Sequence, residues 1–239
     1  HVHSGFRRTS RSYIGTSSAL TSFNIPKLTR KDISGLAYKI VPSDRWNATA
    51  FIKYYNQHSE GAISGNADGV GNYVKQSKQV SALGYGAAGS YHIIKNLQAK
   101  LSYEKAYRLP TNDELFGDED LEAGKTDLRP EKSDNLNLNL NYNWQTGKHG
   151  WYVEAALIYR DTKDFIKRGI GKHGALQYGI YENHGHVKTK GYNLALRYKY
   201  GSWLSVGGAF NNADTRDYEP YYAAGSGQKN VHYKDRLPN

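Results

Sequence analysis

The sequence predicts an all-β protein whose strands form an antiparallel meander, the wall of a transmembrane β-barrel. Three observations support this: side chains alternate between apolar and polar with a period of two, the alternating segments reach ten or more residues, and their connections alternate between short and long. A soluble sandwich usually has strands of about 5–6 residues. Long two-faced strands with short turns at one end and long loops at the other are typical of membrane barrels.

The composition excludes several other classes. The 239 residues carry a net charge of +10 and include 21 Tyr, 4 Trp and 25 Gly, but no Cys. A chain this aromatic is not typical of disorder. Without Cys there is no disulfide framework and no Cys-based zinc or redox site. The sequence also contains no run of the roughly 18–20 apolar residues that a membrane-spanning helix needs.

The clearest strand covers 134–144. Its apolar side chains are Leu136, Leu138, Leu140, Tyr142 and Trp144. Its polar side chains are Asn135, Asn137, Asn139, Asn141 and Asn143. Successive residues of a strand point to opposite faces. We therefore expect the apolar set to face lipid and the asparagines to face the barrel lumen.

The other strands follow the same rule with differing regularity. The alternation recurs at 96–107 and 191–200. Less regular versions occur at 34–41, 45–55, 79–92, 151–166 and 203–211. Short turns are expected at 42–44, 94–96, 145–148 and 201–202, and long loops at 10–33, 57–78, 109–132 and 215–229. Aromatic residues at the strand ends, where a membrane-interface girdle is expected, are Trp144, Trp151, Tyr200 and Trp203.

The segment 111–132 is strongly acidic. It holds eight acidic and three basic residues, a net of −5, so the rest of the chain carries +15. Such segregation could steer a charged ligand. The alternative is a solvated acidic loop, with basic residues elsewhere contacting lipid phosphates. The segment lacks the spacing of a calcium-binding loop, and we expect no metal there.

Two sequence boxes resemble those of TonB-dependent outer-membrane receptors. The first covers 107–117, with Arg-Leu-Pro leading to Glu-Leu-Phe-Gly, and the second covers 127–135, with Asp-Leu-Arg-Pro-Glu. The residues that carry the resemblance are Tyr107, Arg108, Pro110, Glu114, Leu115, Asp127, Leu128, Pro130 and Glu131. Segments 159–166, 183–185, 190–192 and 237–239 resemble later strands of the family in order. Tyr107 and Leu109 depart from the more usual Phe and Ala.

The resemblance implies a 22-stranded barrel in the outer membrane of a Gram-negative bacterium, with short periplasmic turns and long extracellular loops. It implies that 1–239 is a partial barrel, with the N-terminal plug domain and the terminal strands outside this chain. Such receptors import scarce nutrients, mostly ferric siderophores but also haem, cobalamin or glycans, with energy transduced by TonB. The implied partners are the TonB complex, a ferric chelate or similar small nutrient, membrane lipid and lipopolysaccharide.

The ligand-binding candidates are basic residues of the lumen-facing parity: Arg108, Lys100, Arg197 and Lys199. Arg108 is the best single candidate, because its planar guanidinium suits carboxylate or catecholate oxygens. The alternative for Arg108 is a salt bridge to a neighbouring acid such as Glu104.

A haem ligand is less favoured by the sequence. Haem receptors of this family usually place an axial His between the two boxes, and 111–126 contains no His. The remaining candidates are His58, His173, His184 and His186. His184 and His186 would share one side of a strand and could hold a metal, but ordinary hydrogen bonding is the simpler interpretation. We expect no resident cofactor and no metal site.

Other function classes find little support. The sequence has no Gly-x-Ser-x-Gly, P-loop or His-Glu-x-x-His motif, so we expect no catalytic residues. Its bases are dispersed and its aromatic residues share the lipid-facing parity, which argues against nucleic-acid binding. The competing class is a soluble β-sheet module, a carbohydrate binder or adhesin, with Leu136, Leu138 and Leu140 buried against a second sheet.

Overall fold

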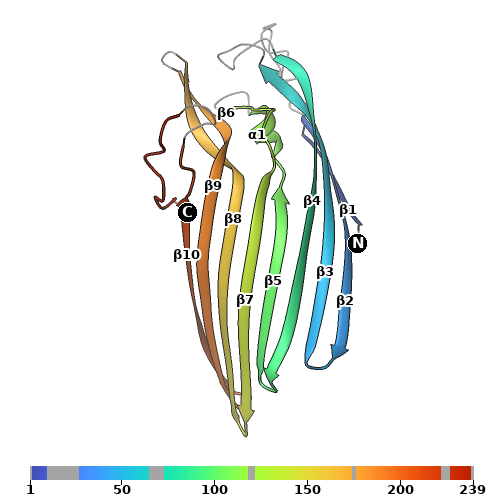
Figure 1. The fold of residues 1–239 in the computed structure, drawn as a ribbon, viewed down its shortest axis with the longest axis vertical. Helices are drawn as coiled ribbons and strands as arrows, with labels where there is room; N and C mark the ends of the chain where they lie inside the picture. The colour runs from blue at the N-terminus through green and yellow to red at the C-terminus, as the bar shows by residue number, and fades with distance from the viewer. Residues whose placement is uncertain are drawn as a thin grey trace.

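The computed structural model describes residues 2–9, 27–64, 73–117, 122–173, 176–221 and 227–237. Within these ranges the chain forms one antiparallel meander in which each strand pairs with the next (Figure 1). Its strands are β1 (Val2–Thr9), β2 (Lys27–Ser43), β3 (Trp46–Ser64), β4 (Tyr73–Ile94), β5 (Leu97–Arg108), β7 (Glu131–Thr146), β8 (His149–His173), β9 (Leu176–Tyr200) and β10 (Leu204–Asp217). A short helix, α1 (Asn112–Phe116), and a two-residue strand, β6 (Glu122–Ala123), lie between β5 and β7.

The strand register confirms the alternation. Leu138 lies opposite Leu101 on one side and Leu157 on the other, and Asn139 lies opposite Lys100. The sheet therefore has an apolar face, which carries the leucine row, and a polar face, which carries Lys100 and the asparagines. Large side chains of the apolar face are open to the surroundings, as in Leu136 at 44% and Leu157 at 58% exposure. In the described part of the chain no second sheet covers them, contrary to the soluble-module alternative.

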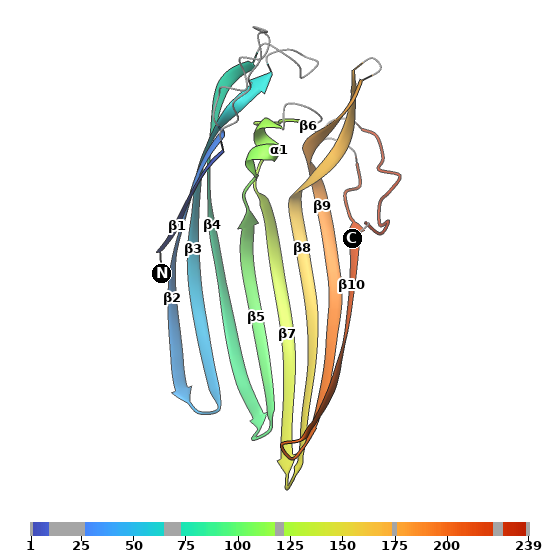
Figure 2. The same ribbon diagram turned by 180° about the vertical axis from the view of Figure 1, so that it is seen from behind.

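The four short turns are confirmed at one end of the sheet (Figure 2). Gly147 and Gly201 occupy two of these turns with φ of +52° and +56°. That left-handed conformation costs glycine little, because it has no Cβ. Trp46, Trp151 and Trp203 lie near these turns and are exposed, as an aromatic girdle requires.

At the other end the strands are longer than expected. β2 begins at Lys27, β3 runs to Ser64, β4 begins at Tyr73 and β10 ends at Asp217. The predicted loops are therefore wrong over 27–33, 57–64, 73–78 and 215–217. Residues 10–26, 65–72 and 222–226 of those loops lie outside the described residues.

The hairpin of β8 and β9 is the largest such difference. The two strands stay paired as far as His173 and Leu176, well beyond the predicted strands 151–166 and 191–200. Beyond the apolar face the two strands mix polar and apolar residues, such as Lys167 and Ile170, without a period of two. A periodicity test that needs one apolar side therefore misses strands that are held by their backbone hydrogen bonds. Among the described residues no helix is long and apolar enough to cross a membrane.

Candidate ligand site on the polar face of the sheet

Between β5 and β7 the described residues 109–117 and 122–130, which we call the strap, fold against the polar face at the end opposite the short turns (Figures 1 and 2). Its α1 begins with a capping box, in which the Thr111 hydroxyl accepts from the Glu114 amide and the Glu114 carboxylate accepts from the Thr111 amide at 2.8 Å. This arrangement satisfies backbone donors that the first helical turn leaves free. It allows a helix of only five residues to form.

One end of the strap is attached to β2 and β3. Gln57 Nε2 donates to the Pro110 carbonyl at 2.7 Å, and the Thr29 hydroxyl bonds the Asn112 side chain. The Phe116 ring lies directly over Gly61, where a Cβ would come within 2.5 Å of the ring. Tyr55, Val80 and Leu109 form a small buried cluster below this attachment.

The other end of the strap is attached to β8 and β9. β6 pairs in parallel with β9, and the Glu122 carboxylate accepts from Arg168 Nε at 2.8 Å and from the Tyr181 hydroxyl at 3.0 Å. A buried cluster of Leu115, Phe116, Leu128 and Ile166 joins the strap to β8. The strap therefore crosses the end of the sheet from β2 and β3 to β8 and β9.

The family-motif residues build this strap. Pro110, Leu115 and Leu128 are fully buried, and Glu131 is almost fully buried. Glu114 closes the capping box. Most of the motif residues therefore stabilise the fold of the strap.

Arg108 is held by two acids of the motif. Its Nη1 donates to Glu114 Oε1 at 3.0 Å and its Nη2 donates to Glu131 Oε1 at 2.7 Å, and Glu131 Oε1 also accepts from the Ile166 amide. Partial burial would lower the pKa of Arg108, but hydrogen bonds and charge from the two carboxylates raise it overall. The guanidinium therefore stays charged, and 41% of the side chain remains exposed.

Arg108 thus forms salt bridges to neighbouring acids, as the alternative for this residue expected, but with Glu114 and Glu131 rather than Glu104. Glu104 accepts instead from Lys53 Nζ at 2.7 Å. Arg108 bonds Glu131 because the two residues lie opposite each other in the β5–β7 register. Its role in ligand binding stays a prediction.

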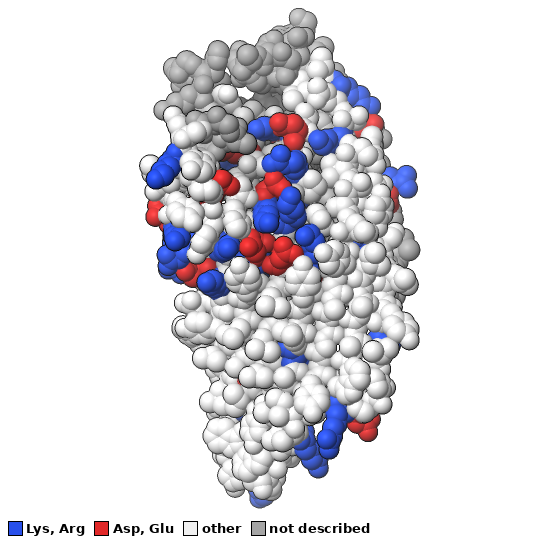
Figure 3. All heavy atoms as spheres, viewed as in Figure 1, with Lys and Arg blue, Asp and Glu red and all other residues white. Residues whose placement is uncertain are grey.

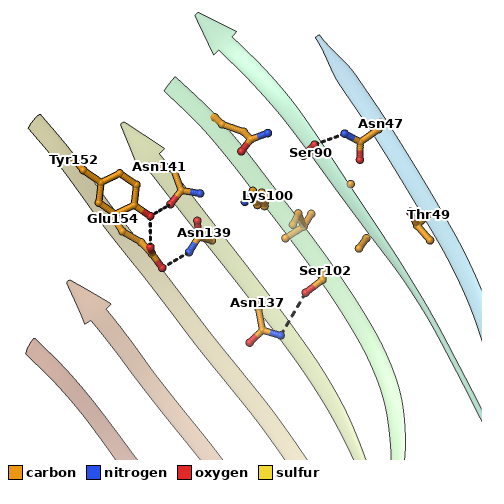
Figure 4. Close-up of a pocket in the computed structure, with 14 residues that line it drawn as sticks. Asn47, Thr49, Ser90, Lys100, Ser102, Asn137, Asn139, Asn141, Tyr152 and Glu154 are labelled. Atoms are coloured by element: carbon orange, nitrogen blue, oxygen red, sulfur yellow. Dashed lines mark hydrogen bonds between the residues drawn. The ribbon is translucent and has the colours of Figure 1, made fainter. Parts of the chain in front are cut away.

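Nearer the short turns the polar face holds an open pocket of about 610 Å³. Side chains of Asn137, Asn139 and Asn141 line it together with Lys100 and others from β3, β4 and β8 (Figure 4). The Glu154 carboxylate accepts from Asn139 Nδ2 at 2.9 Å and from the Tyr152 hydroxyl at 2.6 Å. The other Asn139 side-chain atom, Oδ1, is buried without a hydrogen-bond partner.

The four predicted ligand-binding residues share the polar face but not one site. Lys100 lines the pocket, and Arg197 lies beside it, with its guanidinium 6.0 Å from the centre of the Tyr152 ring. Lys199 lies one step nearer the turns, opposite Gly150, whereas Arg108 lies at the strap. Asn135 also lies on this face and accepts from Arg160 Nε at 2.8 Å. Asn143 continues the row opposite Tyr152.

Sequence reasoning missed Lys53 and Arg160 on this face. Arg160 lies opposite Asn135 in the register. The sequence does indicate this position for Arg160, because Leu157 and Tyr159 set the parity of β8 and place Arg160 on the polar side.

Three of the four candidate histidines, His58, His184 and His186, have side chains that are already hydrogen-bonded. His58 bonds Gln79 and Glu60, both at 3.1 Å, and His184 and His186 bond Asp217 and Asp161. The side chain of His173 lies outside the described residues. No group of three His, Cys, Asp or Glu side chains that could hold a metal occurs in the part of the chain that the structure describes.

An antiparallel meander with an exposed apolar face and a polar opposite face is the wall of a β-barrel. The model of the family described as "TonB dependent receptor-like, beta-barrel" matches residues 2–239, so the chain belongs to this family. Comparison with curated protein sequences finds no match.

Solved structures share the fold at low sequence identity. A double mutant of the Serratia marcescens hemophore receptor HasR, in complex with its hemophore HasA and heme, is 12% identical, with a TM-score of 0.60 over 89% of this chain and 40% of its own. The copper transporter OprC is 12% identical, with a TM-score of 0.65 over 81% of this chain and 30% of its own. The FrpB iron transporter from Neisseria meningitidis is 16% identical, with a TM-score of 0.60 over 90% of this chain and 28% of its own. The chain thus spans well under half the length of these structures.

Proposed function

We propose that the receptor containing this chain imports a ferric siderophore across the outer membrane of a Gram-negative bacterium, with energy supplied by the TonB complex through a plug-bearing N-terminal region outside this chain. Family membership supports the receptor class. The choice of an anionic ferric chelate rests on the charge of the polar face.

The observation that carries the choice of ligand is a predominance of cations along the polar face. In the described strands these cations include Lys31, Lys39, Lys53, Lys100, Arg108, Arg160, Arg197 and Lys199. Of these, Arg160 bonds only an amide oxygen and Arg197 lies over an aromatic ring. Neither has a carboxylate partner among the described residues, so their charge is available to an anionic ligand. A wall with an excess of positive charge also raises the encounter rate with such a ligand.

The candidate histidines lie apart from the cations of the polar face. His58 in β3 and His184 and His186 in β9 have the parity of the apolar face of the sheet. None of these three is therefore placed beside the cations, which favours a chelate recognised by charge over haem. Ferric siderophores already surround the iron with oxygen ligands, so the protein needs only to recognise their outer charge.

A binding titration tests this proposal. The whole receptor, purified in detergent, is titrated with haemin, a ferric catecholate and a ferric hydroxamate while tryptophan fluorescence is followed. We expect saturable binding of a ferric siderophore, weakened at least about tenfold by Arg160→Gln, because each lost charge-assisted contact contributes about 1.5–3 kcal/mol. Lys75→Gln, at an exposed ion pair on the opposite side of the sheet, is the matched control and should change nothing. Tight haemin binding with no response to any ferric siderophore would overturn the proposal.

A further inference from the structure

Two cations of the polar face lie near the short turns, far from Arg160. Arg197 and Lys199 are neighbours on the polar side of β9, and both residues are exposed. Neither has a carboxylate partner among the described residues. Arg160 lies opposite Thr189, and Arg197 lies eight residues further along β9. At the rise of a strand this is roughly 26 Å, so Arg197 and Lys199 form a group of their own.

The surroundings of Arg197 leave room for a ligand. Its guanidinium lies 6.0 Å from the centre of the Tyr152 ring. That ring is fixed in place, because the Tyr152 hydroxyl donates to Glu154 at 2.6 Å (Figure 4). Gly207 lies opposite Arg197 on β10, so no side chain crowds the guanidinium from that strand. The open pocket of about 610 Å³ begins beside it, at Tyr152.

The wall between Arg160 and Arg197 holds no unpaired acid. Glu154 is the acid of β8 that faces this part of the polar side, and it already accepts from Asn139 and Tyr152. On β9 and β10 the side chains that face the polar side over this distance are small and neutral. They are Gly191, Asn193, Ala195, Ala209, Asn211 and Ala213. An anion that moves along this wall therefore meets no repelling charge between the two arginines.

The outer face of the sheet is nearly uncharged at this level. In Figure 3 the charged side chains gather in a band toward the end opposite the short turns, above a wide surface that carries few charges. Arg197 and Lys199 alternate along β9 with Leu196 and Tyr198, which have the parity of the apolar face. Charged side chains inside membrane-spanning segments are rare, and those that face a lumen mark substrate pathways. The position of the two cations therefore indicates a role in the lumen.

We propose that Arg197 and Lys199 form an inner station for the anionic chelate, which the chelate occupies after it leaves the wall around Arg160 and before it passes the short turns. The Tyr152 ring forms one side of this station. The inference rests on the proposed function and deepens it, because it divides the cations of the polar face between capture and transit.

The test separates binding from uptake in cells that produce the whole receptor. The probe is a ferric catecholate labelled with radioactive iron. Binding is measured after the proton gradient is collapsed, and uptake is measured at saturating probe with the gradient intact. We expect Arg197→Gln with Lys199→Gln to keep the Kd within about twofold and to slow uptake at least about fivefold, since an interaction made only after the first binding step changes the rate and not the affinity. Arg160→Gln should instead raise the Kd.

The charge-matched control is Arg45→Gln with Lys95→Gln, which removes one arginine and one lysine from the short turns and not from the polar face. Its uptake should equal that of the wild type. The conservative variant Arg197→Lys with Lys199→Arg keeps both charges and should keep most of the uptake. Because neither cation has a carboxylate partner, all these variants should fold, which thermal unfolding of the purified receptors checks.

The outcomes are distinct. Unchanged uptake in Arg197→Gln with Lys199→Gln, a raised Kd in place of slower uptake, or an equal loss in the charge-matched control overturns the inner station. A wild type that does not bind the ferric catecholate overturns it as well. A wild type that binds no ferric siderophore of any kind overturns the proposed function itself.

Discussion

At the scale of single residues, Arg108 is a motif side chain whose observed contacts stabilise the fold. Its two carboxylate partners lie one on the strap and one at the start of β7. It therefore links the strap to the wall at the end of the sheet opposite the short turns.

Replacing Arg108 should loosen this link. In Arg108→Gln the carboxylates of Glu114 and Glu131, 12% and 11% exposed, lose their cation. We expect a loss of about 1 kcal/mol in the free energy of unfolding, because the arginine side of the pair is partly in solvent. Chemical denaturation of the receptor measures it, with Arg30→Gln, at the more exposed pair with Asp32, as the control. An equal effect of both substitutions would show that Arg108 is only a surface charge.

Asp217 gives a prediction about pH. Burial alone would raise its pKa, but hydrogen bonds from the Glu219 amide, Asn230 and His184 outweigh this and hold the pKa below its usual range. A carboxyl whose pKa is lower in the fold binds protons more readily when unfolded. Its stabilisation is thus present above about pH 4, the ordinary aspartate pKa, and is lost as the pH falls toward the lower folded value.

The Asp217→Asn variant should remove that dependence. An amide cannot accept from all three donors, so we expect a loss of about 1–3 kcal/mol at neutral pH from a buried donor left unpaired. Unfolding curves between pH 7 and pH 3 should show a shallower decline for the variant than for the wild type. Parallel declines would contradict the assigned role of this carboxyl.

At the scale of elements, the strap depends on a close approach between α1 and β3. A Cβ on Gly61 would lie 2.5 Å from Phe116 Cγ, and Phe116 is buried and cannot swing away freely. Gly61 is therefore the position where the smallest substitution should displace the strap.

Gly61→Ala should cost about 1–3 kcal/mol through overpacking and should open the strap. Hydrogen exchange of 109–130 in the receptor measures this, and faster exchange is expected there than in β7. Gly208→Ala is the matched control, since a Cβ at Gly208 meets nothing within 4 Å. Unchanged exchange in Gly61→Ala would mean that the helix does not need this contact.

At the scale of the whole molecule, the two-faced strands and the short turns could be predicted from sequence, because one apolar face imposes a period of two. The asparagine row and Leu136, Leu138 and Leu140 lie on opposite faces as predicted. The extended hairpins could not be predicted, since their polar and apolar residues do not alternate with a period of two. The strap and the partners of Arg108 depend on contacts between segments far apart in sequence, such as Phe116 with Gly61, which no local pattern encodes.

The most direct test of this account is a pair of adjacent substitutions in β7. Leu138→Arg puts a charge on the apolar face, and Asn139→Arg puts the same charge on the polar face beside Glu154. Equilibrium unfolding of the receptor in lipid vesicles should show a loss of about 2–4 kcal/mol for Leu138→Arg, the cost of arginine near the bilayer midplane, and little change for Asn139→Arg. A tolerated Leu138→Arg beside a damaging Asn139→Arg would reverse the faces and contradict the account.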